Sequence, residues 1–128
     1  MNMLKSEIIS SAVSSLNMSE DGVGTRRYCF GPEFIGFEGH FPGFPILPAV
    51  VQILCGVVVA EEIKGAFLEP LNIHKAKFLL KLKPGQEIEV QCREKSVHGK
   101  DGFEVHIKTD EGLASSFSMA YALKDSER

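Results

Sequence analysis

The sequence predicts an α+β fold in which one long central helix is wrapped by a curled antiparallel sheet of five or six strands. Residues 49–63 are apolar on nearly every helical face, as expected of a helix enclosed by other structure. After this run, segments of alternating apolar and polar residues are separated by glycine-containing turns, which is typical of sequential antiparallel strands. Such a sheet has one apolar face, and the helix would cover it.

The N-terminal third predicts a short helix, a strand and a loop. Over residues 6–16 the apolar side chains recur at helical spacing, which favours a short amphipathic helix. Residues 19–22 have the composition of a turn, and residues 23–30 are rich in strand-forming side chains. Repeated glycines and prolines in residues 31–45 indicate an ordered loop.

The central helix carries signals at both ends. Pro48 suits the first turn of a helix, where its missing N–H group costs no hydrogen bond. Glu61, Glu62 and Lys64 indicate that the end of the helix reaches solvent, and Gly65 suits the position just beyond it. We therefore expect the helix to follow Pro48 directly and to end next to Gly65.

Four strands are expected in the second half, with turns at residues 84–85, 99–102 and 110–112. The side chains expected on the core face are Ala76, Phe78, Leu80 and Leu82, then Ile88, Val90 and Cys92, then Phe103, Val105 and Ile107, and finally Phe117, Met119 and Tyr121. One helix cannot cover a sheet of this size. We therefore expect at least a dimer, formed through a sheet edge or an exposed face.

Composition narrows the class of protein. With 128 residues the chain has the size of a single domain, residues 1–128, and its formal charge of −3 argues against general nucleic-acid binding. Three cysteines without paired spacing indicate reduced thiols and a cytoplasmic protein. No signal peptide or membrane span is expected, because the longest apolar run is short and interrupted. His74, His98 and His106 lack metal-ligand spacing, and we expect no metal and no cofactor.

The most informative segment is Gly39–Ile53, which reads Gly-His-Phe-Pro-Gly-Phe-Pro-Ile-Leu-Pro-Ala-Val-Val-Gln-Ile. His40 is its one titratable group, and the prolines and glycines stiffen the backbone between this imidazole and the apolar helix. A histidine held in this way is suited to proton transfer. The alternative is a structural histidine that bonds to backbone carbonyls of its own loop.

This segment resembles the Gly-His-Phe-Pro-Gly-x-Pro-x-Leu/Met-Pro motif of the hot-dog-fold 3-hydroxyacyl-[acyl-carrier-protein] dehydratases of fatty-acid synthesis. The later order of helix, Pro-Gly turn and strands is also similar, so the resemblance covers most of the chain and implies the hot-dog fold. In that family the histidine removes the α-proton of a 3-hydroxyacyl thioester, and a backbone N–H at the helix start polarises the thioester carbonyl. An acidic residue on the partner subunit's helix protonates the leaving hydroxyl.

The resemblance assigns the general base to His40 and the helix-start N–H to Ala49, where the family has glycine. The family's acid position falls on Leu54, and a leucine side chain cannot transfer a proton. The resemblance also implies that five further residues bind the substrate: Gly43, Phe41, Phe44, Gln52 and Leu54.

Few carboxylates could replace the missing acid. Glu61 and Glu62 follow Leu54 by roughly 10–12 Å along the helix, which is beyond reach of the same spot. Glu33 and Glu38 belong to the loop that precedes His40, and only Glu38 is close enough in sequence to touch the site.

Together these features predict a 3-hydroxyacyl-thioester dehydratase-like protein that acts on an acyl-carrier-protein or CoA thioester. The alternatives are an acid-less subunit of a heteromeric dehydratase, an acyl-thioesterase, and a non-catalytic acyl-binding module. In the first alternative a paralogous chain supplies the acid to His40, and a homodimer would be inert. The lysines at 75, 77, 81 and 83 form either a solvated strand face or a docking surface for an acidic carrier protein.

Overall fold

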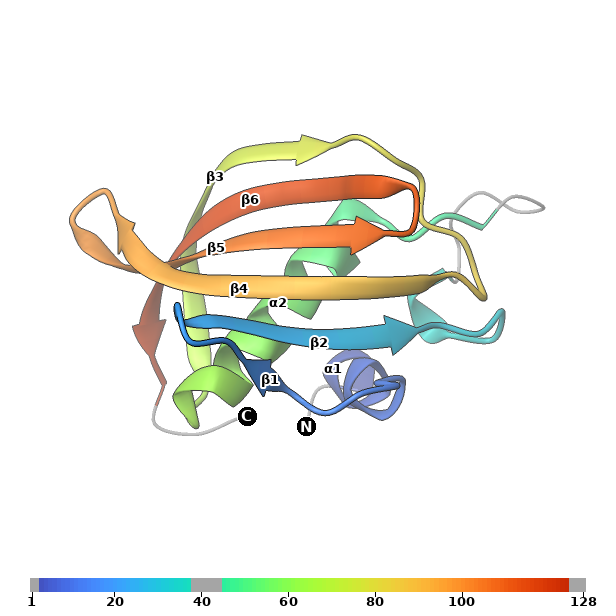
Figure 1. Ribbon diagram of the computed structural model, residues 1–128, viewed down its shortest axis with the longest axis horizontal. Coiled ribbons are helices and arrows are strands. Elements are labelled where there is room, and N and C mark those ends of the chain that lie inside the picture. Colours follow the sequence, from blue (N-terminus) through green and yellow to red (C-terminus); the bar gives the residue numbers. More distant parts are fainter. Residues whose placement is uncertain (1–2, 38–44, 125–128) are drawn as a thin grey trace.

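The computed structural model describes residues 3–37 and 45–124 (Figure 1). Its six strands form one antiparallel sheet in the order β1-β2-β4-β5-β6-β3, and α2 crosses one face of this sheet. The predicted α+β architecture is therefore confirmed. The elements in chain order are α1 (Met3–Ser10), β1 (Asn17–Met18), β2 (Val23–Cys29), the 3-10 helix η1 (Ile35–Phe37), α2 (Ala49–Lys64), β3 (Leu68–Phe78), β4 (Glu87–Val97), β5 (Lys100–Thr109) and β6 (Gly112–Leu123).

The hydrophobic core lies between α2 and the face of the sheet that it covers. The inward-facing residues predicted for β4, β5 and β6 are all buried. Gly56 allows α2 to approach the sheet closely, because a Cβ at this position would lie 2.9 Å from the Phe117 ring and 3.0 Å from a Val105 methyl. The helix ends as predicted: Gly65 has a φ of 65° and donates its N–H to the Glu61 carbonyl at 2.8 Å.

The first helix is shorter than its apolar spacing predicts, because α1 ends at Ser10 and not at residue 16. The hydroxyls of Ser10 and Ser11 both donate to the Glu7 carbonyl, which competes with continuation of the helix. Beyond this point the chain runs along β2, where Val13 donates its N–H to the Arg27 carbonyl at 2.8 Å. Pairing with a strand thus replaces the last turns of the expected helix.

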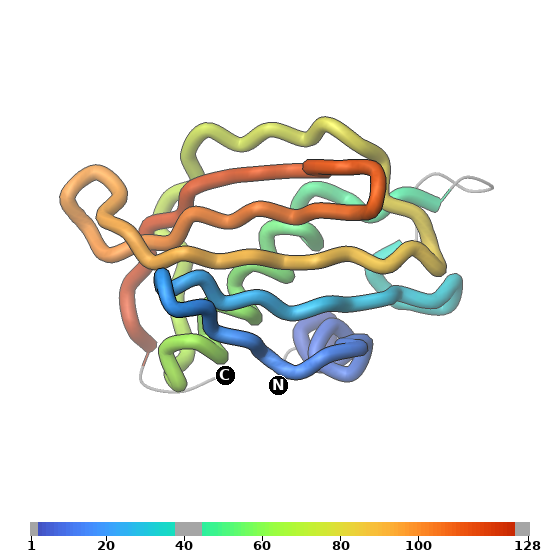
Figure 2. The backbone as a smooth tube through the Cα atoms, viewed as in Figure 1, coloured from blue at the N-terminus to red at the C-terminus, as the bar shows by residue number. Residues whose placement is uncertain are grey.

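The strand expected before the turn at residues 84–85, with Ala76, Phe78, Leu80 and Leu82 on its core face, lies earlier in the chain than predicted. Strand β3 ends at Phe78, and the side chains of Ala76 and Phe78 are exposed instead of facing the core. Figure 2 shows this strand at the edge of the sheet, where β6 is its one neighbour among the described strands. A register shift between His74 and Lys77, with Lys75 at a φ of 54°, interrupts the alternation of faces. Alternation of lysine and apolar residues therefore does not report burial within β3. Beyond the end of the strand, Leu82 is buried as predicted and Leu80 packs against the core.

The turn between β4 and β5 is tighter than predicted. Val97 pairs directly with Lys100, so His98 and Gly99 form the turn, whereas residues 100–102 already belong to β5. Both turn residues have positive φ angles, 50° and 78°, as a two-residue type I′ hairpin requires.

Among residues 3–37 and 45–124, no helix is long and apolar enough to cross a membrane.

Candidate functional site

Four of the predicted site residues, His40, Phe41, Gly43 and Phe44, lie outside the described residues. Their roles remain predictions from the sequence. The described chain reaches Phe37 at the end of η1 and continues from Pro45 towards α2. The geometry of the site therefore comes from the two ends of this loop and from the first turns of α2.

Ala49 is the first residue of α2 and is exposed. Pro48 caps the helix with an extended backbone and contributes no side-chain hydrogen bond. The N–H groups of Val51 and Gln52 both donate to the Pro48 carbonyl at 3.1 Å. Within the described part of the chain the Ala49 and Val50 N–H groups have no acceptor. Free N–H groups at a helix N-terminus are suited to bind a partly negative oxygen, as the predicted role of Ala49 requires.

Gln52 is turned into the protein, and only 4% of its surface is exposed. Its Nε2 donates a hydrogen bond to the Leu47 carbonyl at 3.0 Å. Its Oε1 is buried and has no partner among the described residues. The amide thus contacts the end of the loop that precedes α2.

Leu54 is partly buried and packs against the core, close to the exposed Val50 and the half-buried Ile53. Neither neighbour has a proton to donate. Leu54, at the position where the family resemblance places the acid, can itself make only apolar contacts.

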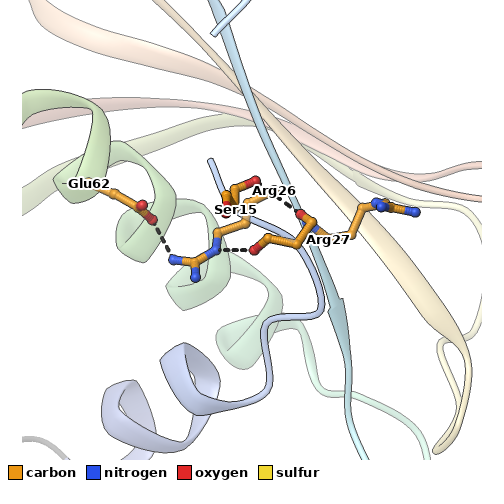
Figure 3. A network of polar contacts seen from close by, with 5 residues as sticks. Ser15, Arg26, Arg27 and Glu62 are labelled. Atoms are coloured by element: carbon orange, nitrogen blue, oxygen red, sulfur yellow. Dashed lines mark hydrogen bonds and ion pairs between the residues drawn. The ribbon is translucent and has the colours of Figure 1, made fainter. Parts of the chain in front are cut away.

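The two carboxylates farther along α2 are engaged elsewhere. Glu61 forms an ion pair with Lys5 at 2.7 Å and accepts the Leu68 N–H at 2.9 Å. Glu62 forms an ion pair with Arg26 at 2.7 Å, and the same guanidinium donates from Nε to the Ser14 carbonyl at 2.8 Å. Figure 3 shows Arg26 reaching from β2 to Glu62 on α2. Both carboxylates thus fasten α2 to other elements. Glu38, the other carboxylate expected near the site, lies outside the described residues.

An aromatic cluster leads from β2 to the loop. Phe30 and Phe34 stack with ring centroids 4.2 Å apart, and Phe37 meets Phe34 edge-on at 5.8 Å. All three are buried in the hydrophobic core. The Glu7 carboxylate accepts the Ile35 N–H at 3.2 Å, between Phe34 and Phe37 in the sequence. The sequence analysis did not identify this contact.

In residues 3–37 and 45–124 no three His, Cys, Asp or Glu side chains are grouped so that they could hold a metal ion.

Comparison with known proteins identifies the family. The family model of ApeI-like proteins, described as ApeI dehydratase, matches residues 18–117. The chain belongs to the ApeI-like dehydratase family. It is also 32% identical over 119 residues to the 3-hydroxyacyl-[acyl-carrier-protein] dehydratase FabZ of Alkaliphilus metalliredigens, covering 84% of this chain and 78% of that protein. FabZ of Clostridium botulinum is 27% identical over 111 residues, which cover 81% and 76% of the two chains.

Solved structures support the fold of this ApeI-like chain. The dehydratase heterocomplex ApeI:P from Xenorhabdus doucetiae matches with a TM-score of 0.75 and 21% identity, over 87% of this chain and 96% of the other. Protein PH1136 from Pyrococcus horikoshii matches with a TM-score of 0.65 and 11% identity, over 90% and 85%. The predicted hot-dog fold is therefore confirmed.

Proposed function

We propose that this chain is the base-supplying subunit of a 3-hydroxyacyl-thioester dehydratase, built as one hot-dog domain over residues 1–128. His40 removes the α-proton of the thioester, and the Ala49 N–H stabilises the negative charge that develops on the carbonyl oxygen. The β-hydroxyl then leaves as water once an acid has protonated it, which yields the 2-enoyl thioester. The observation that carries this proposal is the start of α2 at Ala49, directly after the His40 motif, where the N-cap residue Pro48 makes no side-chain hydrogen bond.

The acid comes from a second, different chain. Leu54 lies at the family's acid position, and Glu61 and Glu62 are both held in ion pairs with other elements. In the homodimer each His40 would face a partner helix that also carries leucine. A paralogous hot-dog chain with a carboxylate at this position would complete the site. The ApeI:P protein, described as a dehydratase heterocomplex, provides a precedent for such an assembly.

The edge of the sheet at β3 supports association with a second chain. Within residues 3–37 and 45–124 this strand pairs with β6 alone, so its other edge offers backbone groups that no described strand pairs with. Leu71, Phe78 and Leu79, in this strand and just after it, expose between 41% and 58% of their surfaces. An edge with exposed apolar side chains is suited to pair with another subunit, in a homodimer or in a heteromer.

A carrier protein is a suitable bearer of the thioester. Lys81 and Lys83 are exposed in the connection between β3 and β4. Leu82, between them, accepts the Leu47 N–H at 2.8 Å, so both lysines lie near the residues that precede α2. Positive charge beside the entrance of the proposed site would steer an acidic acyl-carrier protein towards it. A CoA thioester is the alternative substrate.

The proposal is tested with the purified chain and a 3-hydroxyacyl-carrier thioester, alone and mixed with a paralogous hot-dog chain that carries the acid. We expect enoyl product only in the mixture, and its loss in the His40→Ala variant. Leu54→Glu, which restores a carboxylate on this chain's own helix, should give the homodimer measurable activity. Release of free thiol would instead indicate a thioesterase. Substrate binding without any product, even in the Leu54→Glu variant, would indicate an acyl-binding module.

A further inference from the structure

A hollow lies on the outer face of the sheet, the face that α2 does not cover. Figure 1 views the sheet from this side, with α2 behind the strands. The hollow has a volume of about 340 Å³, and its polar lining comes from β3, β4, β5 and β6: Lys75, Lys77, Lys95, Glu104, Ser116 and Ser118. The sheet separates this outer-face hollow from α2, so it does not belong to the site proposed at the start of that helix.

The strand register places these polar side chains on one face. In β6, Ser116 and Ser118 alternate with Phe117, whose side chain is buried in the core. Ser118 pairs with Glu104 on β5 and with His74 on β3. Residues directly opposite each other in an antiparallel sheet share a face, so all three point away from α2.

A bulge in β3 adds lysine side chains to this face. His74 pairs with Ser118 and Lys77 pairs with Ser116, so three residue steps along β3 match two along β6. Without the extra residue, Lys77 would point to the face opposite His74, which is the side of the core. The bulge contains Lys75 at a φ of 54°, a left-handed conformation that is uncommon for lysine. The irregular backbone therefore brings Lys77 beside the two serines.

The outer-face hollow carries an excess of positive charge. Glu104 is the one carboxylate of its lining, and Oε2 of Glu104 lies 3.9 Å from the Lys95 ammonium and 3.7 Å from Nε2 of His106. Lys75 and Lys77 are exposed, and among the described residues neither has a carboxylate within ion-pair distance. Because Lys95 offsets Glu104, two ammonium charges remain unbalanced, and they favour a bound anion.

The donors of the hollow match a phosphate group. Ser118 is only 7% exposed, and its hydroxyl forms no hydrogen bond with any described residue. A phosphate group carries roughly two negative charges and offers three strong acceptor oxygens, which suits lysine ammonium groups together with a hydroxyl donor. The volume is at the lower end of the range for small-molecule sites, roughly 300–1,000 Å³. A small ligand therefore fits this hollow better than the surface of a protein does.

We propose that the outer-face hollow binds a phosphate group, either free or carried by a small metabolite. The ammonium groups of Lys75, Lys77 and Lys95 hold its charge, and the Ser118 hydroxyl donates to one of its oxygens. A second chain at the free edge of β3 would extend the sheet in its own plane, so it would lie beside the hollow and leave it open. The inference does not depend on the proposed function.

Titration of the ¹⁵N-labelled full chain, followed by NMR at constant ionic strength, tests the site. The probes are inorganic phosphate and adenosine 5′-monophosphate, and the tighter of the two shows whether the group is bound free or on a metabolite. We expect saturable shifts of the amides of Lys75, Lys77 and Ser118. Lys75→Gln/Lys77→Gln should weaken binding roughly tenfold or more, the effect of losing charged hydrogen bonds. The charge-matched control is Lys100→Gln/Lys124→Gln, which removes two exposed lysines outside the hollow and should bind as wild type does.

Two further variants give opposite signs. Ser118→Ala should weaken binding roughly three- to tenfold, whereas Glu104→Gln should tighten it roughly threefold because the one carboxylate of the hollow is lost. Shifts that grow without saturating, or equal weakening in the Lys100→Gln/Lys124→Gln control, would overturn the proposal. Weaker binding by Glu104→Gln would do so as well. Saturable shifts with an acyl-carrier protein, but with neither phosphate compound, would identify a protein-docking surface and would also overturn it.

Discussion

Lys5 and Glu61 form an ion pair of 2.7 Å in which each side chain is only 11% exposed. The pair joins α1 to the last turns of α2, and the second oxygen of Glu61 accepts the Leu68 N–H at the start of β3. The Lys5 ammonium also lies 5.5 Å from the centre of the Phe67 ring. Three elements thus meet at one carboxylate, which is shielded from solvent and from screening by salt.

Replacing this lysine should destabilise the protein. Lys5→Met keeps most of the apolar stem but leaves the Glu61 carboxylate largely buried without its cation, so we expect a loss of about 2 kcal/mol in the free energy of unfolding. Urea denaturation measures this value. The matched control is Arg27→Met, because the Arg27–Glu87 pair is about half exposed and should contribute less than about 0.5 kcal/mol. Equal losses in the two variants would contradict the expected effect of burial.

A methyl group at Gly56 should also destabilise the fold. Alanine favours a helix over glycine by about 1 kcal/mol, but the added Cβ would meet the Phe117 ring at 2.9 Å and Val105 at 3.0 Å. Both side chains are buried in the core and have no free space to move into. The steric strain should therefore outweigh the higher helix propensity of alanine and lower the free energy of unfolding by about 1–2 kcal/mol. Thermal and urea unfolding of Gly56→Ala measure the balance. Gly31→Ala, where the new Cβ would meet nothing within 4 Å, should be neutral, and a stabilised Gly56→Ala protein would refute the close approach.

The sequence predicts those elements whose signals are local. The start of α2 after Pro48 and its end at Gly65 depend on the conformations of these two residues, and both are as expected. The faces of β4 and β5 are also predicted, because a central strand with one covered face must alternate. The edge strand β3 does not follow this rule. Side chains on both of its faces are exposed, and the pairing register with β6 shifts after His74, so alternating residue types no longer predict which side chains are buried.

The site is predicted in its motif but not in its supports. The motif locates Ala49 at the helix start, and the structure has α2 begin there. The hydrogen bond between Glu7 and Ile35 joins residues 28 positions apart, and no local pattern announces such a contact. The sequence likewise gives no sign that the Gln52 amide turns inward to Leu47, because this depends on how the loop and α2 pack together. By contrast, the lack of a carboxylate at Leu54 is evident from the sequence alone.

Cysteine reactivity should follow burial. Burial raises the pKa of the Cys55 thiol to about 12 and also raises the pKa of the Cys92 thiol. The Cys92 thiol donates a hydrogen bond to the Gly56 carbonyl at 3.6 Å. At pH 8 both groups are therefore protonated and inaccessible, and only the half-buried Cys29 should react with a thiol reagent such as DTNB. We expect one fast thiol in the native protein and three in denaturant. Cys29→Ser should abolish the fast phase, and any fast thiol that remains in this variant would contradict the buried state of Cys55 and Cys92.

Charge reversal beside the proposed entrance should weaken the use of a carrier-bound substrate. In the Lys81→Glu/Lys83→Glu variant we expect KM for a 3-hydroxyacyl-carrier thioester to rise roughly three- to tenfold at low salt, with kcat unchanged, because steering acts on encounter and not on chemistry. The difference should shrink at high ionic strength, where exposed charges are screened. Lys100→Glu, at the β4–β5 hairpin, is the control and should leave KM unchanged. Because it reverses one charge instead of two, an effect on log KM half as large as in the double variant would mean that net charge alone governs the encounter. An unaffected KM in the double variant would favour a CoA thioester or a docking surface elsewhere.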